Sequence, residues 1–323
     1  MFKATPSVGL IAIGRNEGER LKRCLQSVPN HVAVVYVDSA SNDDSVIFAK
    51  STNAAVVELD MTVPFSAARA RNEGLNALRQ SDPDIQYVQF IDGDCELESE
   101  WLTAAAAFLT SNASVAAVCG RRRERYPDAS FYNRMCDDEW NTPVGQANAC
   151  GGDALVRVNA FVEVGGYDPA IIAGEEPELC QRLRAAGWKI WRLDESMTIH
   201  DADMHRFGQW WKRAIRSGFG YAQVYHKTAA GGSDPLYWRE LRSALFWTFG
   251  VTTAALLLTY LLGTAGLALA AAVWLAQLFR LAQRNGFAKG THLLVGKVAE
   301  TVGIWRFVLG KVRGRKQGAI FYK

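Results

Sequence analysis

The amino-acid sequence predicts an α/β fold, with a mostly parallel central sheet, helices on both of its faces and hydrophobic helices near the C-terminus. Three observations support this prediction. Strand-like and helix-like patterns alternate through roughly the first hundred residues, and repeated βα units are typical of a parallel sheet. Hydrophobic residues make up 49% of the 323-residue chain and charged residues 21%, which suits a packed globular protein. Residues 243–279 contain no Asp, Glu, Lys, Arg or His.

Each element of the alternation has its own pattern. Short apolar runs predict buried strands, and amphipathic stretches between them predict helices. The predicted strands are 8–13, 32–37, 54–59, 85–91 and 189–193, and the predicted helices are 16–28, 65–80 and 175–188. Asn16 and Glu19 are spaced as a capping box for the first helix. Loops that leave the carboxyl ends of parallel strands form the ligand site of such sheets, so we expect Asp38, Asp92 and Asp94 along one edge.

The charge-free segment 243–279 predicts a membrane-associated hairpin. As one helix its 37 residues would span roughly 55 Å, whereas a bilayer core is about 30 Å thick, so two helices with a turn at 263–266 fit better. Residues 280–323 hold ten Lys or Arg and one acid, and residues 1–279 have a net charge of −6. Two crossings keep both parts on the cytoplasmic side, and residues 291–316 have the composition of an interfacial helix. Buried helices of a soluble domain are the alternative.

Two acidic motifs follow predicted strands. Asp92, Gly93 and Asp94 form a tight turn with two carboxylates, which supply the oxygen ligands that Mg²⁺ or Mn²⁺ accepts. An ordinary acidic turn is the alternative. Asp38 ends a strand, where a carboxylate can accept hydrogen bonds from a base or ribose, or else cap the next helix.

Two further motifs place charges at predicted helix starts. Arg69 and Arg71 could clamp a diphosphate there, although two solvated surface arginines would look the same. Glu175 and Glu176 are favoured by the helix dipole, so they are either structural or a source of a general base.

Six segments occur in an order that is characteristic of one enzyme family. They are "RNE" at 15–17, "VDSASNDDS" at 37–45, "ARNEG" at 70–74, "DGD" at 92–94, "GGDALVRVNAFVEVGGYD" at 151–168 and "GEEPELCQRL" at 174–183. Over roughly residues 6–225 the chain therefore resembles a family 2 glycosyltransferase with the GT-A fold. The resemblance is to the inverting, DXD-containing, membrane-attached bacterial type.

The resemblance implies transfer of a sugar from a nucleotide-diphosphate sugar to an acceptor hydroxyl, with inversion and with a divalent metal, Mn²⁺ or Mg²⁺. It implies nucleotide binding by Asn16, Asp38, Ser41, Arg71 and Asp92, metal binding by Asp92, Asp94 and His200, and acceptor binding by Gly151, Gly152, Trp210 and Trp211. The general base falls on Glu176 or Glu175, where the family usually has Asp, and the choice stays open. Membrane seating or plain packing are alternatives for Trp210 and Trp211.

The predicted organisation is a GT-A catalytic domain at 1–225, a connector at 226–242, the hairpin at 243–279 and a basic interfacial tail at 280–323. Membrane attachment suggests a lipid-linked glycan or exopolysaccharide precursor as acceptor, an inner or plasma membrane location with the catalytic domain and tail cytoplasmic, and no nucleic-acid partner. The chain lacks the QxxRW motif of processive synthases, which indicates single additions. The alternatives are a sugar-1-phosphate nucleotidylyltransferase, for which no glycine-rich basic loop follows the first strand, and an inactive membrane scaffold.

Overall fold

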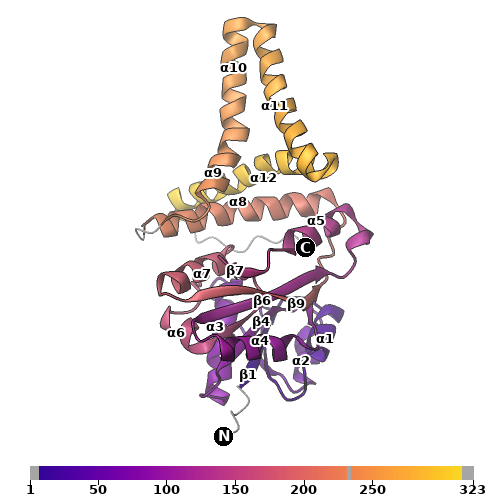
Figure 1. Ribbon diagram of the computed structural model, residues 1–323, viewed down its shortest axis with the longest axis vertical. Helices are drawn as coiled ribbons and strands as arrows, with labels where there is room; N and C mark the ends of the chain where they lie inside the picture. Colours follow the sequence, from indigo (N-terminus) through magenta and orange to yellow (C-terminus); the bar gives the residue numbers. More distant parts are fainter. Residues whose placement is uncertain (1–6, 231–233, 315–323) are drawn as a thin grey trace. The chain divides into compact units, whose positions relative to one another are not determined.

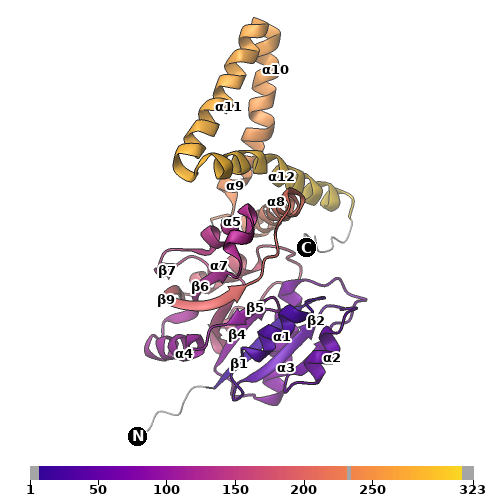
Figure 2. The same ribbon diagram turned by 90° about the vertical axis from the view of Figure 1, so that its right-hand side faces the viewer.

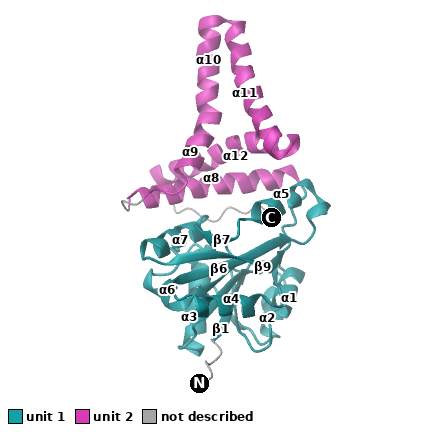
Figure 3. Ribbon diagram, in the orientation of Figure 1, with its two compact units in different colours: residues 1–205 teal, residues 206–323 magenta. Residues whose placement is uncertain are grey.

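The computed structural model describes residues 7–230 and 234–314. It divides into two compact units, Met1–His205 and Arg206–Lys323 (Figure 3). The strands of the described residues all lie in the first unit, and the second unit is helical. The division falls before residue 225, the predicted end of the first domain, because the long helix after His205 packs with the C-terminal helices.

The first unit is built around a nine-stranded sheet (Figures 1 and 2) in the order β3-β2-β1-β4-β8-β6-β9-β5, with β7 paired to β9. Its strands are β1 (Val8–Gly14), β2 (Ala33–Asp38), β3 (Ala55–Glu58), β4 (Tyr87–Asp92), β5 (Cys95–Leu97), β6 (Val115–Glu124), β7 (Gly145–Ala147), β8 (Ala154–Arg157) and β9 (Lys189–His200). β1 to β4 run parallel, whereas β8 runs antiparallel to both β4 and β6. The α/β class is confirmed, but the sheet is mixed: the repeated βα units form the parallel part β1 to β4, and β6 and β9 make a further parallel pair.

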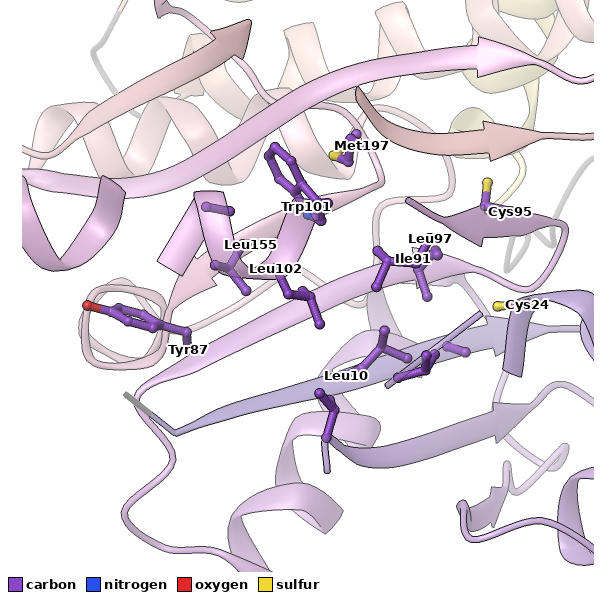
Figure 4. Packing of buried hydrophobic residues seen from close by; sticks show 14 of the residues in the cluster. Leu10, Cys24, Tyr87, Ile91, Cys95, Leu97, Trp101, Leu102, Leu155 and Met197 are labelled. Atoms are coloured by element: carbon purple, nitrogen blue, oxygen red, sulfur yellow. The ribbon is translucent and has the colours of Figure 1, made fainter. Parts of the chain in front are cut away.

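Helices cover both faces of this sheet, as predicted. They are α1 (Glu19–Gln26), α2 (Ser45–Lys50), α3 (Ala67–Ser81), α4 (Trp101–Ser111), η1 (Pro127–Ala129), α5 (Phe131–Trp140), α6 (Val158–Glu163) and α7 (Glu175–Ala185). Successive side chains of a strand point to opposite faces, so β1 contributes to two cores. Leu10 and Ala12 pack in the core that contains Trp101 of α4 (Figure 4). Ile11 and Ile13 pack in the core that contains the apolar side of α3.

Helix α3 lies close against β1 and β2 because its "ARNEG" segment ends in a glycine. A Cβ on Gly74 would lie 2.4 Å from Ile11 Cγ2 and 3.0 Å from Val37 Cγ2. The helix begins after Ser66, whose Oγ accepts a hydrogen bond from the backbone N–H of the third helical residue. Arg71, in the second turn, thereby reaches the carboxyl ends of the strands, where its guanidinium bonds the last residue of β4.

The second unit contains the predicted hairpin of apolar helices. Its elements are α8 (Phe207–Ala230), α9 (Trp238–Leu245), the π-helical turn η2 (Phe246–Gly250), α10 (Val251–Leu262), α11 (Thr264–Asn285) and α12 (Phe287–Val312). Trp238–Leu262 and Thr264–Asn285 are each long and apolar enough to cross a membrane. The turn between them lies at Gly263, whose φ of +62° suits a glycine. Both helices extend beyond the charge-free segment, because helical backbone continues through α9 and to the end of α11.

Candidate active site

The predicted acidic residues lie where β1, β2 and β4 end. Gly14, the last residue of β1, is paired with Asp38 on β2, and Ile13 is paired with Asp92 on β4. Neighbouring strands lie about 4.8 Å apart, so the two aspartates flank β1 at about twice that spacing. The Gly93 N–H donates to the Ile13 carbonyl at 2.8 Å, which holds the DGD turn against β1. The expectation that these carboxylates share one edge of the sheet is confirmed.

Three of the residues expected to bind the nucleotide form one connected group. Asp38 is buried and accepts hydrogen bonds from Tyr36 Oη at 2.9 Å, from Ser41 N at 2.8 Å and from Ser41 Oγ at 2.5 Å. Ser41 Oγ in turn accepts from Asn16 N at 2.8 Å, and Asn16 Oδ1 accepts from Asn42 N at 2.8 Å. These bonds fix the loops after β1 and β2 to one another, so the group presents one preformed surface at the end of the strands.

The predicted capping box at Asn16 is wrong. Helix α1 begins at Glu19 after Gly18, and no side chain caps it. Asn16 has a φ of +56°, a left-handed conformation that asparagine tolerates, and its side chain is turned to the neighbouring loop. The polar side chain therefore orders the edge of the sheet rather than the helix.

Arg71 is the centre of the second group. Its guanidinium is 2% exposed and lies 2.9 Å from Asp92 Oδ1, 2.9 Å from Glu175 Oε1 and 3.5 Å from Glu176 Oε1. Arg69, which the sequence could not distinguish from it, instead donates to backbone carbonyls of a nearby loop. One buried cation thus joins the DGD turn to the start of α7.

Glu175 and Glu176 occupy different environments. The Glu175 side chain is 4% exposed and the Glu176 side chain is 17% exposed. Burial raises the pKa of Glu176 to about 7, and the negative charge of Glu175 adds to the effect, against the opposing charge of Arg71. The carboxyl at position 176 can therefore gain or lose a proton near neutral pH while it remains in contact with solvent.

Asp94 and His200 lie together as a pair that could hold a metal ion. The Asp94 Oδ1 and His200 Nε2 atoms are 3.3 Å apart, close to the roughly 3 Å between adjacent ligands of a small octahedral cation. Cys95 completes the cluster, but burial raises the pKa of its thiol well above the usual value, against the opposing charge of Arg122, whose Nη2 lies 3.1 Å from the sulfur, so the thiol stays protonated. On the other side, Glu124 Oε2 lies 3.7 Å from His200 Nδ1. A carboxylate oxygen and an imidazole nitrogen are both ligands that divalent metal ions accept.

Asp92 takes a different position from Asp94. Burial by itself would raise the pKa of the Asp92 carboxyl, but the guanidinium groups of Arg71 and Arg122 outweigh that effect and lower it. Its two oxygens lie 2.9 Å from Arg71 Nη2 and 3.3 Å from Arg122 Nη2. Among the residues that the structure describes, the metal-ligand cluster contains Asp94 and His200 but not Asp92.

Sequence reasoning missed two residues that organise this site. Asp153 is buried and accepts hydrogen bonds from Asp92 N at 3.1 Å and from Thr198 Oγ1 at 2.8 Å. Arg122 lies 3.5 Å from Asp153 Oδ2 through its Nε and stacks 4.9 Å from the Trp140 ring centre. The only signal for Asp153 was its place directly after the glycines at 151 and 152. Arg122 was hidden in a run of three arginines on β6.

The two glycines expected to bind an acceptor lie at different depths. Gly151 is exposed with a φ of +80°, and no atom would approach a Cβ there. Gly152 is buried beside Arg71, Asp92 and Glu176. Gly152 therefore lies at the centre of the site, whereas Gly151 lies on its exposed side.

The two tryptophans expected to bind an acceptor belong to the second unit. Trp210 is buried, its ring lies 4.9 Å from the His292 ring, and Gly296 leaves room for it. Trp211 stacks on Phe207 with ring centres 5.7 Å apart. These contacts are packing within the helical unit, and the role of both residues toward an acceptor stays a prediction.

Replacing Gly152 by alanine should disturb the arginine centre. A Cβ there would lie 2.8 Å from Arg71 Nη2 and 3.1 Å from Glu176 Oε1. Carboxylates hold the Arg71 guanidinium on both sides, so it cannot move away from a new methyl group. We therefore expect the free energy of unfolding to fall by about 1–3 kcal/mol and the turnover of a nucleotide-sugar donor to fall by about 10²-fold. Denaturant unfolding and initial rates measure the two effects. Gly208→Ala is the control, since no atom lies within 4 Å of its Cβ, and an equal effect there would contradict the argument.

The fold and the site together define an α/β domain whose strand-end loops gather two acidic groups around a buried arginine. Residues 10–156 match the family described as Glycosyl transferase family 2. The resemblance to family 2 glycosyltransferases drawn from the sequence motifs is therefore confirmed over these residues, which make up most of the first unit, and the fold is of the GT-A type.

Two curated relatives are similar over about half of the chain. The succinoglycan biosynthesis protein ExoA of Rhizobium meliloti (strain 1021) is 26% identical over 181 residues, which are 51% of this chain and 50% of that protein. The O-antigen chain rhamnosyltransferase WbaN of Salmonella anatum is 23% identical over 180 residues, 52% of this chain and 56% of that protein. The chain spans about half the length of the curated relatives it matches.

Solved structures share the fold over nearly the whole chain. The mannosyltransferase PcManGT from Pyrobaculum calidifontis, in complex with GDP-Man and Mn²⁺, has a TM-score of 0.63 and 20% identity, covering 94% of this chain and 88% of that one. S. aureus TarS 1–349 has a TM-score of 0.50 and 14% identity, covering 96% and 92%. At these identities the likeness establishes the fold.

Proposed function

We propose that this chain transfers a sugar from a nucleotide-diphosphate sugar to an acceptor hydroxyl with inversion at the anomeric carbon. The observation that carries the proposal is the contact of Arg71 with Asp92, Glu175 and Glu176 at the edge where the Asp38 group also lies. In parallel α/β sheets this edge is the ligand site. One unit thus holds a polar group for a nucleoside, a cation for a phosphate and a carboxyl for proton transfer.

The donor would lie along this edge. Asn16, Asp38 and Ser41 bind the nucleoside, and Arg71 binds the diphosphate side, where Asp92 holds its guanidinium. Mn²⁺ or Mg²⁺ would be held by Asp94 and His200, with Asp92 nearby, and when bound it neutralises charge on the leaving diphosphate. The family resemblance supports these assignments, and the preformed hydrogen bonds keep the residues in place before a donor arrives.

Glu176 is the general base in this proposal. It is the more exposed of the two glutamates, and a pKa of about 7 lets its carboxylate take the proton of an attacking hydroxyl near neutral pH. Glu175 is the more buried and lies 2.9 Å from Arg71, so it positions the guanidinium. Gly152 has no side chain to crowd the Glu176 carboxyl, and the exposed part of that carboxyl is where an acceptor hydroxyl would approach.

The acceptor in this proposal is a lipid-linked glycan or exopolysaccharide precursor, to which single sugars are added. Two helices that could cross a membrane support attachment to a bilayer, with the catalytic domain and tail on the cytoplasmic side. The names of the relatives, a succinoglycan biosynthesis protein and an O-antigen chain rhamnosyltransferase, point to the same class of product.

A thermal-shift screen of nucleoside diphosphates with and without Mn²⁺ tests the proposal on the full chain. GDP with Mn²⁺ is the first pair, since a structure of the same fold was solved with GDP-Man and Mn²⁺. At a ligand concentration of about 100 times Kd, binding stabilises the folded state by about 2.7 kcal/mol. We expect a metal-dependent rise in Tm that Asp94→Ala abolishes.

Glu98→Ala is the control for Asp94→Ala, because the Glu98 carboxylate pairs with Arg123 outside the metal-ligand cluster. No shift with any nucleoside diphosphate would contradict the proposal.

A further inference from the structure

The second unit contains an apolar pocket that the proposed reaction does not use. Its volume is about 480 Å³, within the range of about 300–1,000 Å³ that small-molecule sites occupy. Its floor is formed by Ala222 of α8, Leu241 of α9 and Ile304 of α12, each 6% exposed. The pocket therefore lies between three helices and has a continuous hydrocarbon surface.

A lysine and a histidine meet at the rim of this pocket. Lys311 Nζ lies against His226 Nε2, and both side chains are exposed. Over residues 7–230 and 234–314, neither side chain is paired with a carboxylate. Lys311 Nζ carries three N–H donors, so it can donate to a phosphate oxygen while another of its N–H groups faces the Nε2 lone pair of His226. The rim therefore favours an anion, while the floor favours a hydrocarbon chain.

The helices that form the pocket pack closely against one another. A Cβ on Gly218 of α8 would lie 1.9 Å from the Glu300 carbonyl of α12, so the two backbones are in contact there. Thr301 of α12 is buried, and its Oγ1 donates to the Ala244 carbonyl at 3.0 Å. These contacts fix the three helices to one another before any ligand arrives, which lowers the entropic loss on binding.

The pocket lies in the part of the unit from which the apolar hairpin rises. α12 crosses the base of α10 and α11 in both views (Figures 1 and 2). Only 6% and 11% of the apolar windows of the two hairpin helices are buried, so their side chains are exposed. α12 also exposes Trp305 and Val312, and tryptophan is enriched at membrane–water interfaces. With the hairpin in a bilayer, α12 and the pocket lie at the level of lipid headgroups.

We propose that this pocket binds one anionic phospholipid of the bilayer. Its phosphate accepts a hydrogen bond from Lys311, and the first part of an acyl chain lies on Ala222, Leu241 and Ile304. A choline headgroup would bring a fixed positive charge next to the Lys311 ammonium, so the site discriminates against phosphatidylcholine. The inference rests on the membrane attachment in the proposed function, but not on sugar transfer.

Native mass spectrometry of the full chain in detergent tests this proposal. The probes are dioleoyl phosphatidylglycerol, dioleoyl phosphatidylcholine and inorganic phosphate. We expect one tightly bound phosphatidylglycerol, and about fivefold weaker binding in Lys311→Gln, because one cation near an anionic surface contributes about that factor. Val308→Trp, at the rim, should reduce binding by filling the pocket while leaving the Lys311 ammonium in place. Arg313→Gln is the matched control, because Arg313 is exposed and does not line the pocket.

Three outcomes would overturn the proposal. An equal loss in Lys311→Gln and Arg313→Gln would show general charge attraction, and equal binding of phosphatidylcholine would show an apolar groove without headgroup recognition. Saturation by inorganic phosphate with no effect of Val308→Trp would show a phosphate site that takes no lipid chain. Since none of these readouts requires a nucleotide sugar, failure here is separate from failure of the proposed reaction.

Discussion

Glu176→Gln is expected to lower the turnover of the nucleotide sugar by about 10²-fold or more, because the amide cannot accept the proton of the attacking hydroxyl. Initial rates of donor consumption, with the donor chosen by the thermal-shift screen, measure the effect. In the unsubstituted protein the rate should rise with pH through about 7, as the Glu176 carboxyl loses its proton, and should level off above. In the variant the residual rate should lack that rise.

The pH dependence of stability gives a second, independent readout of the Glu176 carboxyl. Its pKa is raised on folding from 4.5 to about 7, so its contribution to stability is complete below about pH 4.5 and is lost as the pH rises through 7. Glu176→Gln should therefore have a higher Tm than the unsubstituted protein at pH 8 and no advantage at pH 4. A rate near that of the unsubstituted protein, with its pH rise intact, would move the general base elsewhere.

Glu175→Gln is the matched comparison for Glu176→Gln. Glu175 is 4% exposed and lies 2.9 Å from Arg71 Nη1, so its loss should weaken the position of the guanidinium. The expected result is a lower Tm with the pH rise in turnover retained. If the pH rise disappeared in Glu175→Gln and stayed in Glu176→Gln, the two roles would be exchanged.

Features that depend on neighbouring residues could be predicted from the sequence. The apolar runs of β1, β2 and β4 are local patterns, and parallel pairing places their carboxyl ends together, so the edge with Asp38, Asp92 and Asp94 followed directly. The hairpin followed from charge-free length alone. One local pattern gave a wrong prediction. Asn16 has the spacing of a helix cap, but its left-handed backbone turns the side chain away from α1.

Features that depend on distant pairing could not be predicted. Arg122 reaches Asp92 and Asp153 only because β8 returns antiparallel between β4 and β6, and no spacing in the sequence encodes that return. The difference between Glu175 and Glu176 is a difference in side-chain exposure around Arg71, which adjacent identical residues cannot reveal.

Arg71→Met is expected to cause the largest loss of stability, because it leaves buried carboxylates without their cation. Asp92 keeps Arg122 at 3.3 Å, but Glu175 has no second cationic partner among the described residues, and breaking a buried ion pair typically costs about 3–5 kcal/mol. Denaturant unfolding measures the loss, which should shrink at pH 4, where the Glu176 carboxyl is protonated because its pKa is about 7. Arg69→Met is the control on the same helix. It removes only hydrogen bonds to the carbonyls of Asp60 and Val63, so a loss of about 0.5–1.5 kcal/mol per bond is expected.

Arg71→Lys should lose an amount of stability between those of the two methionine variants, since one ammonium cannot replace a planar fork that bonds two carboxylates at once. Equal losses at positions 69 and 71 would mean that the acidic group does not depend on this guanidinium, and the proposed diphosphate contact would lose its support.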